Sequence, residues 1–117
     1  MIFEFLITQR AKKMGYPLMK VKDSVIEQYQ SNVREGCGME KFDIIRKLSR
    51  NWHIGNMTLI HNGIITKAYG NMDIYLDMET MTIIDIVNHK GKARKQYINY
   101  MEKDLVNEIY CIRQEGN

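Results

Sequence analysis

The densest group of side chains that could bind an anion or move a proton lies between residues 89 and 100. A histidine begins it, and cations and tyrosines follow: His89, Lys90, Lys92, Arg94, Lys95, Tyr97 and Tyr100. Cations on a loop and a first helical turn can neutralise phosphates, and nearby aromatic rings can stack on bases. Cations at the beginning of a helix oppose its dipole, a conflict that functional sites tolerate. We predict that the five charged or titratable residues from 89 to 95 contact nucleic acid or a protein partner.

A second basic surface is expected on a helix spanning about residues 39–51. Its cations are Lys41, Arg46, Lys47 and Arg50, of which we select Lys41, Lys47 and Arg50 as binding residues. With the preceding helix it could form a helix-turn-helix, and the hairpin at Asn62-Gly63 could act as a wing. Winged helices do not normally continue into four strands, which ranks this alternative lower.

The middle of the chain is acidic, because residues 57–89 contain one Lys or Arg against four Asp or Glu. Three of these acidic residues and one tyrosine are predicted on the outward face of a sheet: Asp73, Tyr75, Asp77 and Glu79. Such a face could imitate nucleic acid and make the protein an inhibitor. Solvated charges that protect the sheet from aggregation are the simpler interpretation.

Enzymatic and metal motifs are weak in this sequence. Cys37 lies in a Gly-Cys-Gly break before a helix, where its thiol could be activated, but no His or Asp can be assigned to it. His53, His61 and His89 lack zinc spacing, and no GxGxxG or P-loop motif occurs. We therefore expect no metal and no cofactor, and a binding protein is favoured over an enzyme.

The elements that position these residues follow from turn and capping signals. Ser24 and Glu27 form a capping box that begins a helix over about 24–35, and the second helix covers about 39–51. Three turns are predicted at Asn62-Gly63, Gly70-Asn71 and Met78-Glu79, and helical spacing returns over about 92–113. The predicted fold is α+β: two N-terminal helices, a four-stranded antiparallel meander, and a C-terminal helix packed on one sheet face.

Cross-strand pairing gives this meander one apolar face. The predicted row is Ile60, Ile65, Leu76 and Met81, with Ile74 opposite Ile83 in the next row. Trp52 is predicted to be a core anchor over the sheet. Residues 19–117 are expected to form a single domain, and the sequence leaves the structure of residues 1–18 open, as strand or helix turn.

The segment from Asp73 to Tyr97 resembles the sheet end of RelE/ParE-type toxins. The resemblance rests on Asp73-Ile74-Tyr75-Leu76, the turn at Met78-Glu79, Ile83-Ile84-Asp85-Ile86-Val87, and His89-Lys90. It implies two helices before an antiparallel sheet and cleavage of ribosome-bound messenger RNA. It also implies roles for His89, Lys90 and Arg94 as acid and phosphate contacts. The chain departs from that family in its low positive charge and in having Asp73 and Asp77 where arginines are expected.

Composition indicates where such a protein could act. Ile, Met, Lys, Asn and Tyr are frequent, which is typical of an AT-rich gene from a low-GC bacterium, its phages or its plasmids. The basic residues follow the N-terminal apolar run, the reverse of a signal peptide, so we expect a cytoplasmic protein with no membrane partner. The leading hypothesis is a small non-catalytic regulator from a phage or mobile element that docks on nucleic acid or a host protein. The alternatives are an RNA-cleaving toxin and a self-associating structural protein, which could be a homodimer.

Overall fold

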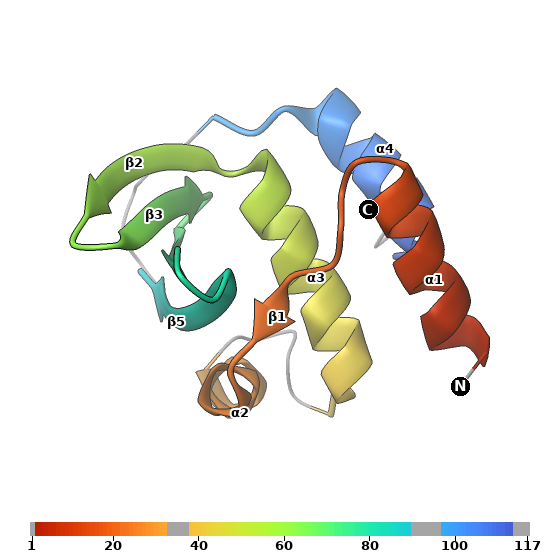
Figure 1. The fold of residues 1–117 in the computed structure, drawn as a ribbon, viewed down its shortest axis with the longest axis horizontal. Coiled ribbons are helices and arrows are strands. Elements are labelled where there is room, and N and C mark those ends of the chain that lie inside the picture. Colours follow the sequence, from red (N-terminus) through yellow and green to blue (C-terminus); the bar gives the residue numbers. More distant parts are fainter. Residues whose placement is uncertain (1, 33–37, 90–96, 114–117) are drawn as a thin grey trace.

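The structure, a computed structural model, describes residues 2–32, 38–89 and 97–113. The elements in chain order are α1 (Ile2–Lys13), β1 (Lys20–Val21), α2 (Asp23–Asn32), α3 (Lys41–Ile54), β2 (Asn56–His61), β3 (Ile64–Tyr69), β4 (Met72–Asp77), β5 (Thr82–Asn88) and α4 (Tyr100–Tyr110) (Figure 1). The predicted α+β class is confirmed.

The sheet has five strands in the order β1-β5-β4-β3-β2, and it is mixed. Strands β2 to β5 form the predicted antiparallel meander, but β1 adds a parallel strand in which Lys20 pairs with Thr82 and Val21 with Ile83. The prediction of four strands was therefore wrong. A strand of two residues shows no alternation of apolar and polar side chains, so no sequence pattern indicates it.

The first two predicted turns are confirmed. Asn62 and Gly63 both have positive φ, at 51° and 78°, as a type I′ hairpin requires. Gly70 has φ 59° in the next turn, and Tyr69 pairs with Met72 across it. These local turns fix the register from β2 to β4, including the predicted pairing of Ile65 with both Ile60 and Leu76.

The third turn differs from the prediction, and the register of β5 differs with it. Residues 78–81 separate the two strands, and a bulge lies between Tyr75 and Leu76. Leu76 therefore pairs with Ile83 instead of Met81, and Ile74 pairs with Ile86 instead of Ile83. Met81 has φ 53° and an exposed side chain, so its placement in the apolar row was wrong. Ile60 is also exposed, because it lies on the edge strand β2.

The main core lies between the inner face of the sheet and helices α2 and α3. It contains Val25, Ile26, Tyr29, Ile44, Leu48, Trp52, Ile74, Leu76, Ile83 and Ile86. Trp52 is buried, as predicted for a core anchor, and the Lys67 ammonium lies 4.5 Å from its ring centroid. Helix α3 thus presents its apolar face to the sheet.

A second, smaller core joins α1, α3 and α4, and it contains Ala11, Ile54, Val106, Ile109 and Tyr110. The C-terminal helix packs mainly on α3 and α1, as Figure 1 shows, so its predicted packing on a sheet face was wrong. It begins at Tyr100 because the Asn99 side chain accepts a hydrogen bond from the Glu102 amide.

Helix α1 corrects the prediction of two helices before the meander. Residues 2–13 form this further helix, and Ile7 and Ala11 are its buried residues. The sequence did not decide between strand and helix for this segment. In the structure α1 packs on α4, and its residue Ala11 belongs to the second core.

Candidate functional site

His89, the first residue of the predicted basic cluster, lies just beyond the end of β5. Its backbone N–H donates to the Asn71 carbonyl oxygen at 2.8 Å, and its Nε2 lies 2.8 Å from Asp73 Oδ2. Both side chains are mostly buried. The contact with the carboxylate holds the imidazole in a fixed orientation. The other predicted residues of this cluster, Lys90, Lys92, Arg94 and Lys95, lie outside the described residues, as does Cys37.

The predicted acidic face is occupied by local contacts. Residues alternate along β4, so that Asp73, Tyr75 and Asp77 lie on the face away from the main core, as predicted. Asp77 accepts hydrogen bonds from the Glu79 amide and the Thr80 hydroxyl, which closes the turn after β4. Asp73 pairs with His89, and Tyr75 also has an interaction partner. Asp73 and Asp77 therefore make contacts that stabilise the sheet and its turn.

The cations predicted to form a basic surface on α3 contact other residues of the chain to different degrees. Lys41 forms an exposed ion pair with Asp23 at 3.1 Å, and the half-buried Lys47 has an interaction partner. Arg50 is 9% exposed, and its guanidinium donates to the side-chain oxygens of Asn51 and Asn107. Its placement on a solvent-facing surface was therefore wrong, because it points between α3 and α4 and not outward.

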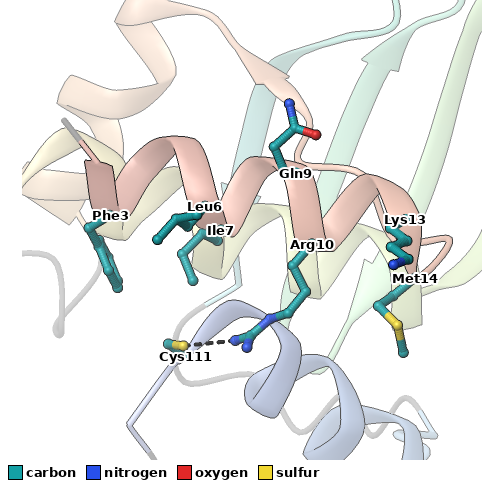
Figure 2. A pocket seen from close by; sticks show the side chains of 8 residues that line it. All are labelled: Phe3, Leu6, Ile7, Gln9, Arg10, Lys13, Met14 and Cys111. Carbon is teal, nitrogen blue, oxygen red and sulfur yellow. Dashed lines mark hydrogen bonds between the residues drawn. The ribbon is translucent and has the colours of Figure 1, made fainter.

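Sequence analysis missed a groove along α1. The groove has a volume of about 710 Å³, and its lining is mostly apolar. It is lined by Phe3, Leu6, Ile7, Gln9, Arg10, Lys13, Met14 and Cys111 (Figure 2). The side chains of Phe3, Leu6 and Met14 are 48%, 57% and 51% exposed. Apolar side chains at positions 3, 6, 7 and 14 recur at helical spacing, and this was the signal available in the sequence.

Arg10 fixes α1 to the end of α4 beside this groove. Its guanidinium donates to the carbonyl oxygens of Glu108 and Ile109. Its Nη2 also lies 2.9 Å from Cys111 Sγ (Figure 2). The last carbonyls of a helix lack partners within the helix, and cations near them are favourable. The groove therefore lies beside an anchored helix.

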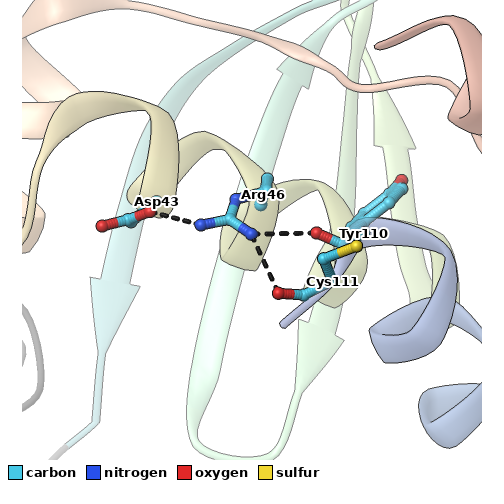
Figure 3. Close-up of polar contacts among 4 residues, drawn as sticks. All are labelled: Asp43, Arg46, Tyr110 and Cys111. Carbon is cyan, nitrogen blue, oxygen red and sulfur yellow. Dashed lines mark hydrogen bonds and ion pairs between the residues drawn. The ribbon is translucent and has the colours of Figure 1, made fainter. Parts of the chain in front are cut away.

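Arg46 of α3 approaches the same helix end from another side. It donates to the carbonyl oxygens of Tyr110 and Cys111 and pairs with Asp43 (Figure 3). Its guanidinium carbon also lies 5.3 Å from the ring centroids of both Phe3 and Phe42. Three helices thus meet at the C-terminus of α4, and Phe3 contacts α3 while it lines the groove.

Three residues with shifted pKa values lie around the connection that follows α1. Tyr16 donates to Glu102 at 2.9 Å, and this hydrogen bond raises the pKa of Tyr16. Burial lowers the pKa of His53, whose Nε2 lies 2.7 Å from the Pro17 carbonyl oxygen. Burial raises the pKa of Tyr110, which donates to the Tyr16 carbonyl oxygen. These contacts hold Tyr16 and Pro17 against α3 and α4.

The part of the chain that the structure describes contains neither a candidate metal site nor a candidate membrane-spanning helix. Residues 2–32, 38–89 and 97–113 contain no group of three or more His, Cys, Asp or Glu side chains that could hold a metal ion. Within the same ranges, no helix has the length and apolar character needed to cross a membrane.

The fold and its surface define a small α+β protein with a mixed five-stranded sheet and an apolar groove on its N-terminal helix. The YorE family model matches residues 19–108, and the chain belongs to the YorE family. This membership is compatible with a small phage-encoded protein. Comparisons with curated proteins and with solved structures find no match. Helix α1 and most of its groove precede the matched residues.

Proposed function

We propose that this chain is a small, non-catalytic, phage-encoded regulator that docks on a host protein through the groove along α1. The observation that carries this proposal is the exposure of Phe3, Leu6 and Met14 along one groove. Apolar patches of this kind on a soluble domain are typical of interaction sites, because their hydration costs free energy that a partner can recover.

The groove suggests the chemistry of the partner segment. An amphipathic helix can lay its apolar face into an apolar groove, with anchors at helical spacing. The last turn of α1 carries Arg10, Lys12 and Lys13, whereas Glu4 is the acidic residue of its first turn. We expect a partner helix with acidic side chains beside its apolar face, because these would lie near the basic end of α1.

A protein partner is preferred to nucleic acid because of what the cations of α3 contact. Arg46 and Arg50 are bound within the fold, and Lys41 is paired with Asp23. A protein that binds nucleic acid along its backbone usually presents several exposed cations, and the outward surface of α3 offers few because Arg46 and Arg50 point into the fold. The cytoplasm is part of the proposal, and the free thiol of Cys111 is consistent with a reducing compartment.

The test is quantitative affinity capture from the lysate of a low-GC bacterium treated with nuclease. Leu6→Glu places a charge in the groove, whereas Phe5→Glu is the matched control, because Phe5 is similarly exposed on α1 but does not line the groove. We expect one host protein to be captured by the wild type and by Phe5→Glu and lost with Leu6→Glu. Equal capture by the two variants, with unchanged circular dichroism, would contradict the proposal.

A second candidate function, RNA cleavage centred on His89, is favoured by the contact between His89 and Asp73. A carboxylate at 2.8 Å can hold an imidazole in a fixed orientation, which general acid or base catalysis needs. Expression should then arrest growth, and His89→Ala should relieve the arrest. A harmless wild-type protein would remove this candidate.

A third candidate, self-association, is favoured by the edge strand β2. Met57, Leu59 and Ile60 are exposed on this strand, which ends the sheet. Exposed apolar edge strands can pair with a second copy. Sedimentation velocity at increasing concentration would show a dimer, and a monomer throughout would exclude this candidate.

A further inference from the structure

A second hollow of about 360 Å³ lies on another part of the surface, and residues from α2, α3, α4, the strands and the loops between them line it. Its lining includes Arg50 and Asn51 of α3, Lys103 of α4, Tyr69 and Gly70 at the β3–β4 turn, and Asn88. Small-molecule sites typically have volumes of about 300–1,000 Å³, so this hollow is large enough for a small ligand.

Among the residues that the structure describes, Arg50 has hydrogen-bond partners but no acidic ion-pair partner. Its Nε and Nη2 donate to Asn51 Oδ1 at 3.1 and 2.9 Å, and Nη1 donates to Asn107 Oδ1 at 2.9 Å. A guanidinium has about five N–H donors, so about two are not used by these three bonds. None of the ion pairs found within residues 2–32, 38–89 and 97–113 includes Arg50.

This arrangement is unusual because a buried charge is normally paired. Arg50 is the one charged side chain among the buried polar residues of the described ranges, and the other four are neutral. Burying an unpaired charge costs free energy, and an anion from outside the chain would offset that cost. The hollow beside Arg50 is the place where such an anion can enter.

A second cation, Lys103, also lines this hollow. The Arg50 guanidinium carbon is 5.7 Å from the centroid of the Tyr69 ring, and Lys103 Nζ is 5.6 Å from the same centroid. The ring stabilises each cation, but two cations on one ring repel each other. An anion that contacts both would turn this repulsion into attraction.

We propose that the hollow binds a phosphoryl group through Arg50 and Lys103. The planar guanidinium suits two phosphoryl oxygens, and a lysine contributes a compact point charge. Asn88, a residue with hydrogen-bonding groups, also lines the hollow. The phosphoryl group could belong to a free nucleotide or to a nucleic-acid strand, which share this chemistry. The site is independent of the groove along α1.

Isothermal titration calorimetry at constant ionic strength tests the site with three probes: inorganic phosphate, adenosine monophosphate and a single-stranded oligonucleotide. We expect saturable binding of at least one probe by the wild type. We expect binding about tenfold weaker with Lys103→Gln, because one charge-assisted contact is lost. The control Lys41→Gln, which removes a cation already paired with Asp23, should bind like the wild type.

Arg50→Lys keeps the charge but loses the planar fork, and it should weaken binding further. If this buried substitution prevents folding, the partly exposed Lys103 still gives the decisive comparison. Tighter binding of the mononucleotide or of the oligonucleotide identifies the source, and either result supports the site. The absence of saturable binding of all three probes would overturn the proposal, as would equal binding by the wild type and Lys103→Gln.

Discussion

Arg10 on α1 donates twice to a single backbone oxygen on α4, since its Nε and Nη2 lie 3.0 and 2.8 Å from the Ile109 carbonyl oxygen. The two residues are 99 positions apart in the sequence. The contact therefore joins the N-terminal helix to the end of the last helix, where unpaired carbonyls favour a cation. It gives the groove along α1 a fixed wall.

Replacing Arg10 should weaken the contact between α1 and the end of α4. Arg10→Met keeps the aliphatic part of the side chain and removes the donors, so the free energy of unfolding should fall by about 1–2 kcal/mol. Urea denaturation followed by circular dichroism measures the change. Lys12→Met on the same helix is the matched control and should stay within about 0.5 kcal/mol of the wild type. Equal effects of the two substitutions would show that the Arg10 contacts contribute nothing specific.

The register of β5 predicts that truncation of two apolar residues changes stability by very different amounts. Ile83 is fully buried opposite Leu76, so Ile83→Ala should cost about 2–5 kcal/mol of unfolding free energy. Met81 is 52% exposed in the turn, so Met81→Ala should change stability by about 0.5 kcal/mol or less. Thermal and urea denaturation compare the two. A larger loss of unfolding free energy in Met81→Ala than in Ile83→Ala would contradict this register and favour the pairing of Leu76 with Met81 that a two-residue turn predicts.

Two glycines should respond to substitution for different reasons. A Cβ at Gly55 would lie 2.8 Å from the Asn51 carbonyl oxygen, so Gly55→Ala should cost about 1–3 kcal/mol through steric overlap. Gly63 has open space around it but φ 78°, so Gly63→Ala should cost about 1–2 kcal/mol through backbone strain alone.

Asparagine separates these two causes. It tolerates positive φ, so Gly63→Asn should recover much of the stability lost in Gly63→Ala. Gly55→Asn should remain destabilised, because its Cβ meets the same backbone oxygen. Urea denaturation of the four variants provides the measurement. Recovery at Gly55, or none at Gly63, would contradict this explanation.

His53 should make stability depend on pH. Burial lowers its pKa from 6.5, the nearby Lys67 lowers it further, and the contact with the Pro17 carbonyl partly opposes both. The unfolded chain therefore binds a proton more readily than the folded protein. The free energy of unfolding should fall as the pH drops through 6.5 and level off below the folded pKa.

Urea denaturation between about pH 7.5 and 5.5 measures this slope in a range above the titration of most carboxylates. His53→Gln should reduce the slope, because glutamine does not titrate and can still donate to the Pro17 carbonyl oxygen. His61→Gln, at the exposed end of β2, is the control and should leave the slope from His53 in place. An unchanged slope in His53→Gln would contradict the assignment.

The parts of the fold that could be predicted from the sequence are those determined by residues that are neighbours in the chain. Asn62-Gly63 and Gly70-Asn71 specify tight turns through their own backbone preferences, so the pairing from β2 to β4 followed from them. The β4–β5 connection has no such dipeptide, and its bulge at Tyr75 moved the partners of Leu76 and Ile74. Strand β1 depends on a pairing between Val21 and Ile83, far apart in sequence.

The candidate sites were harder to predict because they depend on packing between distant segments. Arg50 has helical spacing typical of a solvated cation, but Asn107 of α4 binds it from the other end of the chain. Residues 2–14 show apolar helical spacing, yet only Ile7 and Ala11 of α1 are buried. Which apolar residues remain exposed to form a groove depends on where α4 ends, and that is a tertiary property.

Site-specific photocrosslinking in the host cell tests the docking surface most directly. A benzophenone amino acid is placed either at Leu6, within the groove, or at Phe5, which is exposed outside it. We expect illumination to link the position 6 protein to one host protein, whereas the position 5 protein should give little of this product. An equal yield from both positions, or a product at position 6 that contains only a second copy of this chain, would contradict docking through the groove.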